Sequence, residues 1–193
     1  MRIITGTRAR TKLVPPVDHQ TRPISDRVKE ALFSIIQFEI AGSRVADLFC
    51  GTGSMGLEAI SRGAEHALMV DLNSDAIKGL QQNIKKCGFA SSITVIQGDL
   101  FRAALLAHKL ERCNIVFVDP PYILARENEL DSPLGQLLLN IESQVSTKTR
   151  VIVRHEKKTT LLENYGQLTV TDLRKYGGMT LTFLEKSDDP SDD

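Results

Sequence analysis

The chain has 193 residues, of which 41% are hydrophobic and 25% charged, and its formal net charge is +0. This length and composition are typical of one ordinary globular domain, or of one domain with a small appendage, and they allow a sizeable core. The sequence shows neither an apolar run near the roughly 20 residues of a membrane-spanning helix nor a secretory signal pattern. We therefore expect a cytoplasmic protein without a membrane segment. Because no heptad pattern or apolar stripe demands a partner, we also expect a monomer.

The three cysteines, Cys50, Cys87 and Cys113, lie far apart in the sequence. Neither a C-x-x-C pair nor paired histidines accompany them. An odd number of separated thiols fits reduced cysteines and argues against both a disulfide framework and a zinc site. We therefore expect that the protein holds no metal.

Charge is distributed unevenly along the chain. Residues 1–30 carry seven basic and three acidic groups, whereas residues 187–193 contain four aspartates and no basic residue. A tail of that composition cannot bury apolar surface, and we expect it to be disordered. The sequence thus predicts a basic N-terminal extension over residues 1–24, a main domain over 25–186 and an acidic tail over 187–193.

The predicted elements begin with a hairpin, because strand signals at residues 2–5 and 11–14 flank a turn. Apolar residues at helical spacing after Ser25 then predict a helix that ends before Gly42. From there on, short apolar runs alternate with helical stretches. The predicted strands cover residues 44–49, 66–72, 92–97, 114–119, 149–155, 167–174 and 179–185, and the later helices cover 55–62, 75–87 with Ser74 as its cap and Gly88 after its end, and 133–144.

This alternation of strands and helices favours a parallel sheet with crossover helices. The last two strands instead alternate apolar and polar residues around a turn at residues 175–178, which is typical of an antiparallel hairpin. The sequence therefore predicts an α/β fold with a doubly wound, mostly parallel, seven-stranded Rossmann-like sheet and a C-terminal antiparallel hairpin. The N-terminal hairpin and helix would form a small extension of this sheet.

Gly51, Gly53 and Gly56 form a G-x-G-x-x-G pattern where the first strand of the sheet turns into a helix. Glycine at these positions lets the backbone turn sharply and approach a ligand closely. The pattern suits two classes of ligand. One is a dinucleotide, whose pyrophosphate would bind the helix N-terminus, and the other is S-adenosylmethionine.

Three acids accompany the first three strands of the sheet, namely Asp47, Asp71 and Asp99. The carboxyl ends of parallel strands meet at the edge where such folds bind ligands. Carboxylates there would repel a doubly negative pyrophosphate and attract a sulfonium cation, and Asp71 is suited to accept both ribose hydroxyls. The alternative for Asp71 and Asp99 is N-capping of the next helix.

We expect Cys50 to be a small buried residue, because a cysteine nucleophile would belong in the loop after the fourth strand.

The stretch IVFVDPPY, residues 115–122, is a buried strand followed by an unusual turn. Asp119 could accept one N–H of an exocyclic amino group on a planar base, and the Pro120 carbonyl could accept the other. The fixed φ of Pro120 and Pro121 would hold that carbonyl in place, and Tyr122 offers a ring on which an unstacked base can lie. The alternative is that the acid and the prolines merely terminate the strand.

Five stretches together carry a resemblance to a known family over nearly the whole chain: RIITGTRARTKL, RPISDRVKEALFSII, DLFCGTGSMGLEAISRGA, VDPPY and YGGMTLTFLE. In them the chain resembles the bacterial 16S ribosomal RNA guanine-N2 methyltransferases of the RsmD type, which have the class I S-adenosylmethionine-dependent fold. The resemblance implies methylation of the N2 amino group of one loop guanine in the head of the small ribosomal subunit. The substrate would be an assembled or assembling particle.

The resemblance also implies roles for individual residues. Two positions depart from the family pattern, because Ile24 stands where a threonine is expected and Arg154 where an acid is expected. Next to Ile24, Ser25 keeps a hydroxyl. Contacts to S-adenosylmethionine are expected from Ser25, Asp47, Gly51, Thr52, Gly53, Asp71, Leu72, Asp99 and Leu100, and contacts to the guanine from Asp119, Pro120, Pro121 and Tyr122.

Four basic residues precede the catalytic core, namely Arg8, Arg10, Lys12 and Arg22. They are candidates for contacts to RNA phosphates, which lysine and arginine neutralise. The alternative is that they form an ordinary solvated surface.

Other classes of protein share parts of this pattern. An adenine-N6 methyltransferase of DNA or RNA uses the same Asp-Pro-Pro-Tyr chemistry, although the short insertion over residues 122–133 leaves little mass for reading DNA bases. A protein glutamine methyltransferase is also compatible, and an NAD-dependent oxidoreductase shares the glycine pattern. A non-catalytic RNA-binding module would have no use for the Asp-Pro-Pro-Tyr turn.

Overall fold

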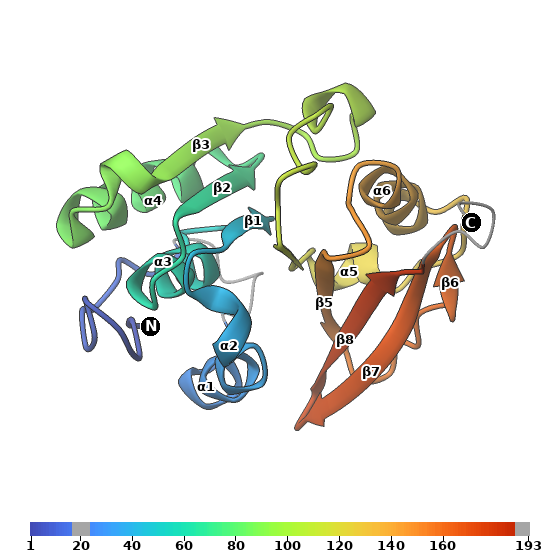
Figure 1. Ribbon diagram of the computed structural model, residues 1–193, viewed down its shortest axis with the longest axis horizontal. Coiled ribbons are helices and arrows are strands. Elements are labelled where there is room, and N and C mark those ends of the chain that lie inside the picture. The colour runs from blue at the N-terminus through green and yellow to red at the C-terminus, as the bar shows by residue number, and fades with distance from the viewer. Residues whose placement is uncertain (17–23, 188–193) are drawn as a thin grey trace. The chain divides into compact units, whose positions relative to one another are not determined.

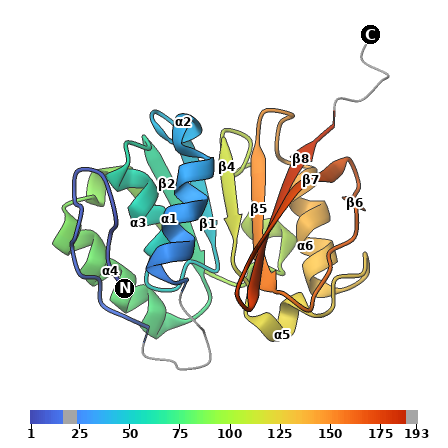
Figure 2. The same ribbon diagram turned by 90° about the horizontal axis from the view of Figure 1, so that it is seen from below.

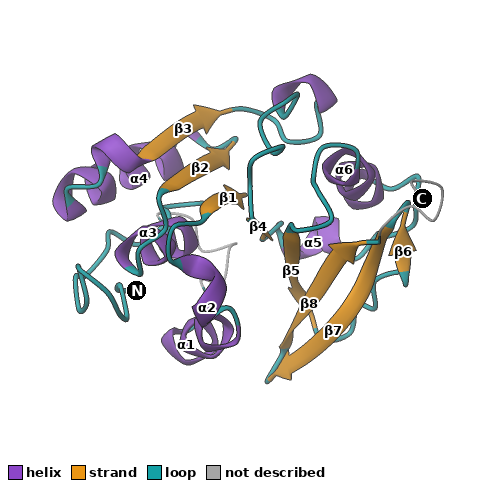
Figure 3. Ribbon diagram, viewed as in Figure 1, coloured by secondary structure: helices purple, strands orange, loops and turns teal. Residues whose placement is uncertain are grey.

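The computed structural model describes residues 1–16 and 24–187. The chain forms two compact units, Met1–Gly98 and Asp99–Asp193. The boundaries predicted near residues 24 and 186 adjoin ranges that are not described, so that division stays a prediction. Strands alternate with helical segments through the middle of the chain, whereas its last four elements are all strands (Figure 3). None of the described helices is both long enough and apolar enough to cross a membrane.

The first unit contains three parallel strands in the order β3-β2-β1, and they confirm the predicted strand–helix alternation. Strands β1 and β2 are apolar and almost wholly buried, and helices α3 and α4 pack against the sheet as its crossovers. The elements are β1 (Arg44–Leu48), α3 (Ser54–Ser61), β2 (His66–Asp71), α4 (Ser74–Cys87), a short 3₁₀ turn (Ala90–Ser92) and β3 (Ile93–Gln97).

The helix predicted after Ser25 is present but broken. It consists of α1 (Asp26–Ile35) and α2 (Gln37–Ile40), because Ile36 leaves the helical conformation at φ −95° and ψ 15°. Ser25 is the N-cap, and its hydroxyl accepts a hydrogen bond from the Val28 N–H at 3.3 Å. The cap predicted from the sequence is thus confirmed.

Helix α4 begins one residue earlier than predicted, and its cap differs. The side chain of Asn73, not of Ser74, accepts hydrogen bonds from the Asp75 and Ala76 N–H groups at 2.8 and 3.1 Å. At the other end Gly88 adopts the left-handed conformation, with φ 73°, and closes the helix. Asn and Ser are equally good caps, so the sequence alone could not distinguish the two neighbours.

The N-terminal segment forms the predicted hairpin, although it contains a single bridge, between Arg2 and Lys12, rather than two full strands. The Ile3 N–H donates to the Thr11 carbonyl at 3.0 Å, and both Ile3 and Leu13 are buried. In Figures 1 and 2 the segment runs beside α3 and α4. Its apolar residues therefore belong to the core of the first unit.

A fully buried carboxylate on α3, that of Glu58, anchors this segment. It accepts hydrogen bonds from the Ile4 and Thr5 N–H groups at 2.7 and 3.0 Å. It also pairs with the buried Lys29 ammonium at 3.2 Å and with Arg62 at 2.7 Å. Burial lowers the pKa of Lys29, and the Glu58 carboxylate opposes that shift. A single charged group thus joins the hairpin, α1 and α3.

The second unit has the strand order β4-β5-β8-β7-β6. Strands β4 and β5 are parallel, whereas β5, β8, β7 and β6 pair antiparallel. The predicted C-terminal hairpin is therefore confirmed, and α6 packs against β6 and β7. The elements are a 3₁₀ turn (Ala103–Leu105), β4 (Ile115–Val118), α5 (Tyr122–Ala125), α6 (Pro133–Glu142), β5 (Arg150–Glu156), β6 (Asn164–Tyr165), β7 (Leu168–Tyr176) and β8 (Met179–Lys186).

The described residues hold eight strands where the sequence predicts seven. The additional strand, β6, has two residues and pairs only with the start of β7. Helix α5 was also not predicted. Neither a strand of two residues nor a helix of four is long enough to show a hydrophobic period.

Replacing the buried carboxylate by Glu58→Gln is expected to lower the free energy of unfolding by about 3–5 kcal/mol, because Lys29 would stay buried without its counter-charge. Urea denaturation gives the measurement. Glu65→Gln is the matched control, since Glu65 pairs with Arg44 at the surface and such pairs contribute at most about 1 kcal/mol. Equal losses in the two variants would contradict the anchoring role of Glu58.

Candidate active site

The glycine loop between β1 and α3 has the backbone conformation that its glycines permit. Gly51 and Gly53 are left-handed, with φ of 55° and 89°. A Cβ on Gly53 would lie 2.5 Å from a methyl group of Leu80, whereas a Cβ on Gly51 would meet nothing within 4 Å. Gly51 therefore leaves room for a ligand to approach. Phe49 is also left-handed, with φ 61°, a conformation that bulky residues rarely adopt outside functional sites.

Two of the predicted acids hold this loop through its backbone amides. The Gly51 N–H donates to Asp71 Oδ2 at 2.7 Å, and the Gly56 N–H donates to Asp47 Oδ2 at 2.8 Å. Asp47 is only 1% exposed, so its charge lies inside the first unit, while Asp71 is half-buried. Both acids thus shape the loop, and Asp71 also reaches its surface.

These hydrogen bonds bear on the choice between the two ligand classes. A pyrophosphate binds such a loop through free N–H groups at the helix N-terminus. Here the Gly51 N–H already donates a hydrogen bond to Asp71, and the Gly56 N–H donates one to Asp47. The negative charges of both acids would also repel an anion. A ligand with a sulfonium and an ammonium group meets no such obstacle. The loop therefore favours S-adenosylmethionine over a dinucleotide.

The end of β2 offers a carboxylate and an apolar side chain side by side. Asp71 does not cap α4, because Asn73 does, so the alternative of N-capping is wrong for Asp71. Its Oδ1 accepts the Asn73 N–H at 2.9 Å, which fixes the carboxylate. The next residue, Leu72, is 63% exposed. A carboxylate suits ribose hydroxyls, and an exposed leucine suits a flat base.

Thr52 and Ser25, both predicted to contact the cofactor, accept hydrogen bonds from residues of the first unit. Thr52 is buried, and its carbonyl accepts the Asn83 side-chain N–H at 2.9 Å. Its hydroxyl finds no hydrogen-bond partner within the described part of the chain. The Ser25 hydroxyl is the cap of α1. Contacts of either residue to a cofactor stay predictions.

Cys50, beside the loop, is buried as predicted. Burial, together with the negative charges of Asp47 and Asp71, raises the pKa of its thiol well above the ordinary value. The thiol therefore stays protonated at neutral pH, which does not suit a nucleophile.

Within residues 1–16 and 24–187, no group of three or more His, Cys, Asp or Glu side chains could hold a metal ion.

In the second unit, Asp99 and Leu100 follow the third strand as predicted. Asp99 Oδ1 accepts the Phe101 N–H at 3.1 Å, so its carboxylate stabilises a turn and caps no α-helix. Leu100 is buried. The half-exposed carboxylate of Asp99 is thus the part of this pair that can reach a ligand from the surface.

The Asp-Pro-Pro-Tyr turn directly follows β4 and leads into α5. The Pro121 carbonyl accepts the Leu124 N–H at 2.9 Å and thereby starts the helix. Among the described residues, no donor reaches the Pro120 carbonyl. Tyr122 is the first residue of α5 and is half-exposed. The turn therefore leaves one carbonyl and one aromatic ring for a ligand.

Arg154, which sequence reasoning could not place, pairs with Asp119. The register of β4 and β5 sets Val118 opposite Val153, so the next residues along both strands are neighbours. Arg154 Nε lies 2.5 Å from Asp119 Oδ1, and the two side chains are 9% and 21% exposed. The Arg154 guanidinium also lies over the Tyr122 ring, 5.7 Å from its centroid. One cation thus orders both the acid and the ring.

This pair governs the charge of the predicted catalytic acid. Burial raises the pKa of Asp119, and the Arg154 guanidinium, by its charge and its hydrogen bond, opposes that shift. The arginine therefore helps to keep the carboxylate ionised. The sequence does contain a signal for this pair, because Arg154 directly follows the apolar run Val151–Val153 within the predicted strand. A cation buried in a strand needs a partner of opposite charge.

The predicted RNA-contacting residues of the N-terminal segment are not equivalent. Arg8 is used within the first unit, where its Nε donates to the Cys87 carbonyl at the end of α4, at 2.7 Å. Arg10 and Lys12 are exposed. Arg22 lies outside the described residues. Their contact with RNA stays a prediction.

The sequence model of the family described as "Conserved hypothetical protein 95" matches residues 1–185. The chain belongs to this family. YlbH of Bacillus subtilis, provisionally named an rRNA methyltransferase, is 33% identical over 178 residues, which are 92% of this chain and 94% of YlbH. Ribosomal RNA small subunit methyltransferase D of Escherichia coli is 35% identical over 122 residues, 63% of this chain and 60% of that protein. The predicted RsmD-type resemblance is thereby confirmed.

Solved structures confirm the fold. The yhhF protein of Escherichia coli, provisionally named a methyltransferase, has a TM-score of 0.79 and 27% identity, with 96% of this chain and 97% of that chain covered. An RNA methyltransferase of Salinibacter ruber, solved in complex with S-adenosylhomocysteine, has a TM-score of 0.65 and 17% identity, with 89% and 98% covered. This member of the Conserved hypothetical protein 95 family thus shares its α/β architecture with those two proteins.

Removing the arginine by Arg154→Met is expected to raise the pKa of Asp119 further, because burial persists while the neighbouring positive charge is lost. A ¹³C NMR titration of the side-chain carboxyl groups gives the measurement. Arg174→Met is the control, since Arg174 pairs at the surface with Asp172 and should leave Asp119 unchanged. An unchanged or lowered pKa of Asp119 in Arg154→Met would contradict the assigned role.

Proposed function

We propose that this protein transfers a methyl group from S-adenosylmethionine to the exocyclic N2 amino group of one loop guanine in the head of the small-subunit 16S rRNA. The substrate is the assembled or assembling particle. The observation that carries the proposal is the carboxylate of Asp119, held by Arg154 next to the ring of Tyr122, in a chain of this family. The choice of guanine N2 rests on the RsmD-type resemblance.

The first unit supplies most of the cofactor contacts. Asp71 accepts the ribose hydroxyls, and the exposed Leu72 covers the adenine. The contacts of Asp99 and Leu100 to the adenine stay predictions of the resemblance. The open backbone at Gly51 receives the methionine end. The carboxylates of Asp47 and Asp71 supply the negative charge that a sulfonium cation favours. S-adenosylhomocysteine in the like-folded Salinibacter ruber enzyme supports this choice of cofactor.

The second unit supplies the contacts to the target base. The lone pair of an exocyclic amino group is delocalised into the base ring, which makes its nitrogen a poor nucleophile. Asp119 accepts one amino N–H through Oδ2, since Arg154 occupies Oδ1, and the Pro120 carbonyl accepts the other. These two acceptors draw the nitrogen towards tetrahedral geometry. The base lies on Tyr122, a contact worth roughly 1–3 kcal/mol.

The remaining demand on the protein is alignment. The N–C bond forms as the S–C bond breaks, so the sulfonium becomes a neutral thioether and the amino nitrogen then loses one proton to solvent. Holding the nitrogen in line with the S–CH₃ bond is a matter of positioning, which enzymes achieve by fixed contacts. Because an ionised Asp119 accepts the amino N–H more strongly than a protonated one, the rate should fall as the pH drops through its raised pKa.

The decisive experiment is methyl transfer from radiolabelled S-adenosylmethionine to small ribosomal subunits isolated from cells without this activity. Naked 16S RNA and duplex DNA serve as alternative substrates, and mass spectrometry identifies the labelled nucleoside. We expect N2-methylguanosine on the particle. Asp119→Asn should lower the rate on the order of 10²-fold or more, whereas Asp172→Asn, at an exposed acid, should not. Unfolding transitions show that both variants fold.

Other outcomes overturn separate parts of the proposal. Label in N6-methyladenine would show that the target base is adenine, and the proposed role of Asp119 would stand. Label in DNA alone would replace the substrate. Transfer by Asp119→Asn at the wild-type rate would remove Asp119 from the mechanism.

The cofactor is tested separately by ligand-induced stabilisation. S-adenosylhomocysteine should raise the melting temperature and NAD should not. Asp71→Asn should weaken S-adenosylhomocysteine binding about 10- to 100-fold, because hydrogen bonds to a charged group contribute about 1.5–3 kcal/mol. Asp75→Asn is the control, as Asp75 lies nearby on α4 and pairs at the surface with Lys78. Stabilisation by NAD alone would show that the assigned cofactor is wrong.

A further inference from the structure

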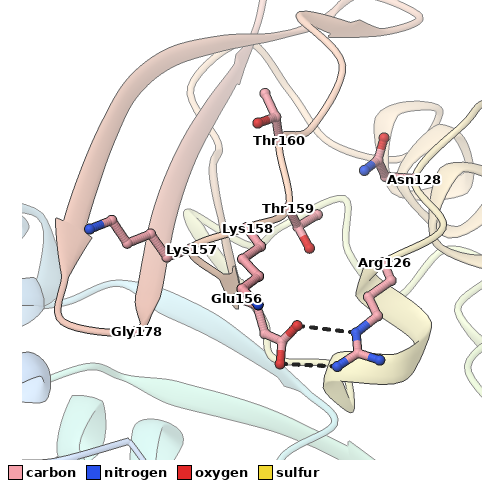
Figure 4. A pocket seen from close by; sticks show the side chains of 8 residues that line it. All are labelled: Arg126, Asn128, Glu156, Lys157, Lys158, Thr159, Thr160 and Gly178. Atoms are coloured by element: carbon pink, nitrogen blue, oxygen red, sulfur yellow. Dashed lines mark hydrogen bonds and ion pairs between the residues drawn. The ribbon is translucent and has the colours of Figure 1, made fainter.

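A basic pocket of about 700 Å³ lies in the second unit, at the ends of α5 and β5 (Figure 4). Three stretches of chain form it: the residues after α5, the end of β5 with its following loop, and the turn between β7 and β8. No role assigned so far involves these residues. The pocket is lined by Arg126, Asn128, Glu156, Lys157, Lys158, Thr159, Thr160 and Gly178.

The charges of this pocket suit an anion. Its lining carries three cations, Arg126, Lys157 and Lys158, and one acid, Glu156. The Glu156 carboxylate is occupied, because it accepts the Arg126 Nε–H at 3.1 Å and a terminal guanidinium N–H at 3.3 Å, as the dashed lines in Figure 4 show. The two lysines are exposed and face no other acid in the lining. The pocket therefore has a net positive charge.

The backbone presents the two lysines in a fixed turn. The Lys157 N–H donates to the Gly178 carbonyl at 2.9 Å, and the Thr159 N–H donates to the Glu156 carbonyl at 3.0 Å. A Cβ on Gly178 would meet nothing within 4 Å, so this side of the pocket stays open. Thr159, Thr160 and Asn128 add neutral donors. An open pocket with charged and neutral donors suits the oxygens of a phosphate group.

The pocket adjoins the site proposed for the target base. Arg154 and Glu156 lie two residues apart on β5, so their side chains share one face of the strand. Arg154 holds Asp119 before α5, and Glu156 holds Arg126 directly after it. The two ion pairs thus fasten α5, with Tyr122 at its start, to β5. The four residues of α5 span about 6 Å, so the pocket begins close to the Tyr122 ring.

We propose that this pocket binds backbone phosphates of the RNA strand that flank the target nucleotide. The inference rests on the proposed function, because an RNA base at Asp119 and Tyr122 brings its own chain past the end of α5. Lys157 and Lys158 neutralise the phosphates, while Arg126 and Glu156 fix the wall of the pocket. This site provides contacts to RNA in the second unit, in addition to those expected from the N-terminal segment.

The test is the salt dependence of binding to naked small-subunit RNA, measured at several salt concentrations with S-adenosylhomocysteine present. For Lys157→Ala/Lys158→Ala we expect weaker binding and a slope of log K against log[salt] that is smaller in magnitude by about 1.4, because each contact to a single strand contributes about 0.7. Lys109→Ala/Lys148→Ala removes the same charge from other exposed positions of the second unit and should keep the wild-type slope.

The outcomes separate this proposal from the proposed function when methyl transfer by the wild type is measured alongside. A wild-type slope in Lys157→Ala/Lys158→Ala, or equal losses in both double variants, would overturn the phosphate site even if the wild type methylates the particle. The expected change in slope without any methyl transfer would support the phosphate site and remove the proposed reaction. A wild type that binds neither naked small-subunit RNA nor the small ribosomal subunit would overturn both.

Discussion

A charge that is taken out of water must be paired, and this constraint determines how the functional segments of both units are held. In the first unit the buried Glu58 carboxylate joins the N-terminal hairpin to Lys29 and α3. The buried Asp47 carboxylate likewise holds the glycine loop through the Gly56 N–H. In the second unit Arg154 neutralises Asp119. The pairings of Glu58 and of Asp119 join residues far apart in the sequence, so these charges organise the tertiary structure as well as the chemistry.

Much of the fold could be predicted from local pattern. The alternation of apolar runs with helical spacing located the seven principal strands, and Gly88 ended α4 as expected. The failures were local as well. Asn73 rather than Ser74 caps α4, Ile36 breaks the first helix, and α5 and β6 are too short to show a period. Each of these features depends on individual hydrogen bonds, which a pattern averaged over many residues does not contain.

The candidate site, too, could be predicted from the sequence only in part. The positions of the glycine loop, of Asp71 and of the Asp-Pro-Pro-Tyr turn followed from motifs at strand ends. Two facts did not follow from motifs. The backbone N–H groups of the loop donate hydrogen bonds to carboxylates, and Arg154 pairs with Asp119. Residues 119 and 154 meet only because β4 and β5 pair in one particular register. A motif specifies chemistry along the chain, whereas the partner that tunes an acid is selected across strands.

The anchoring of the N-terminal hairpin also has a consequence for biosynthesis. The N-terminal hairpin is held by partners that are made much later than the hairpin itself: Glu58 and Ser61 on α3, and Asn83 and Cys87 on α4. Contacts between residues so far apart in the sequence form slowly, because a long loop must close first. The hairpin therefore cannot dock during early translation. Until α4 has emerged, its apolar residues remain exposed to the chaperones that bind nascent chains.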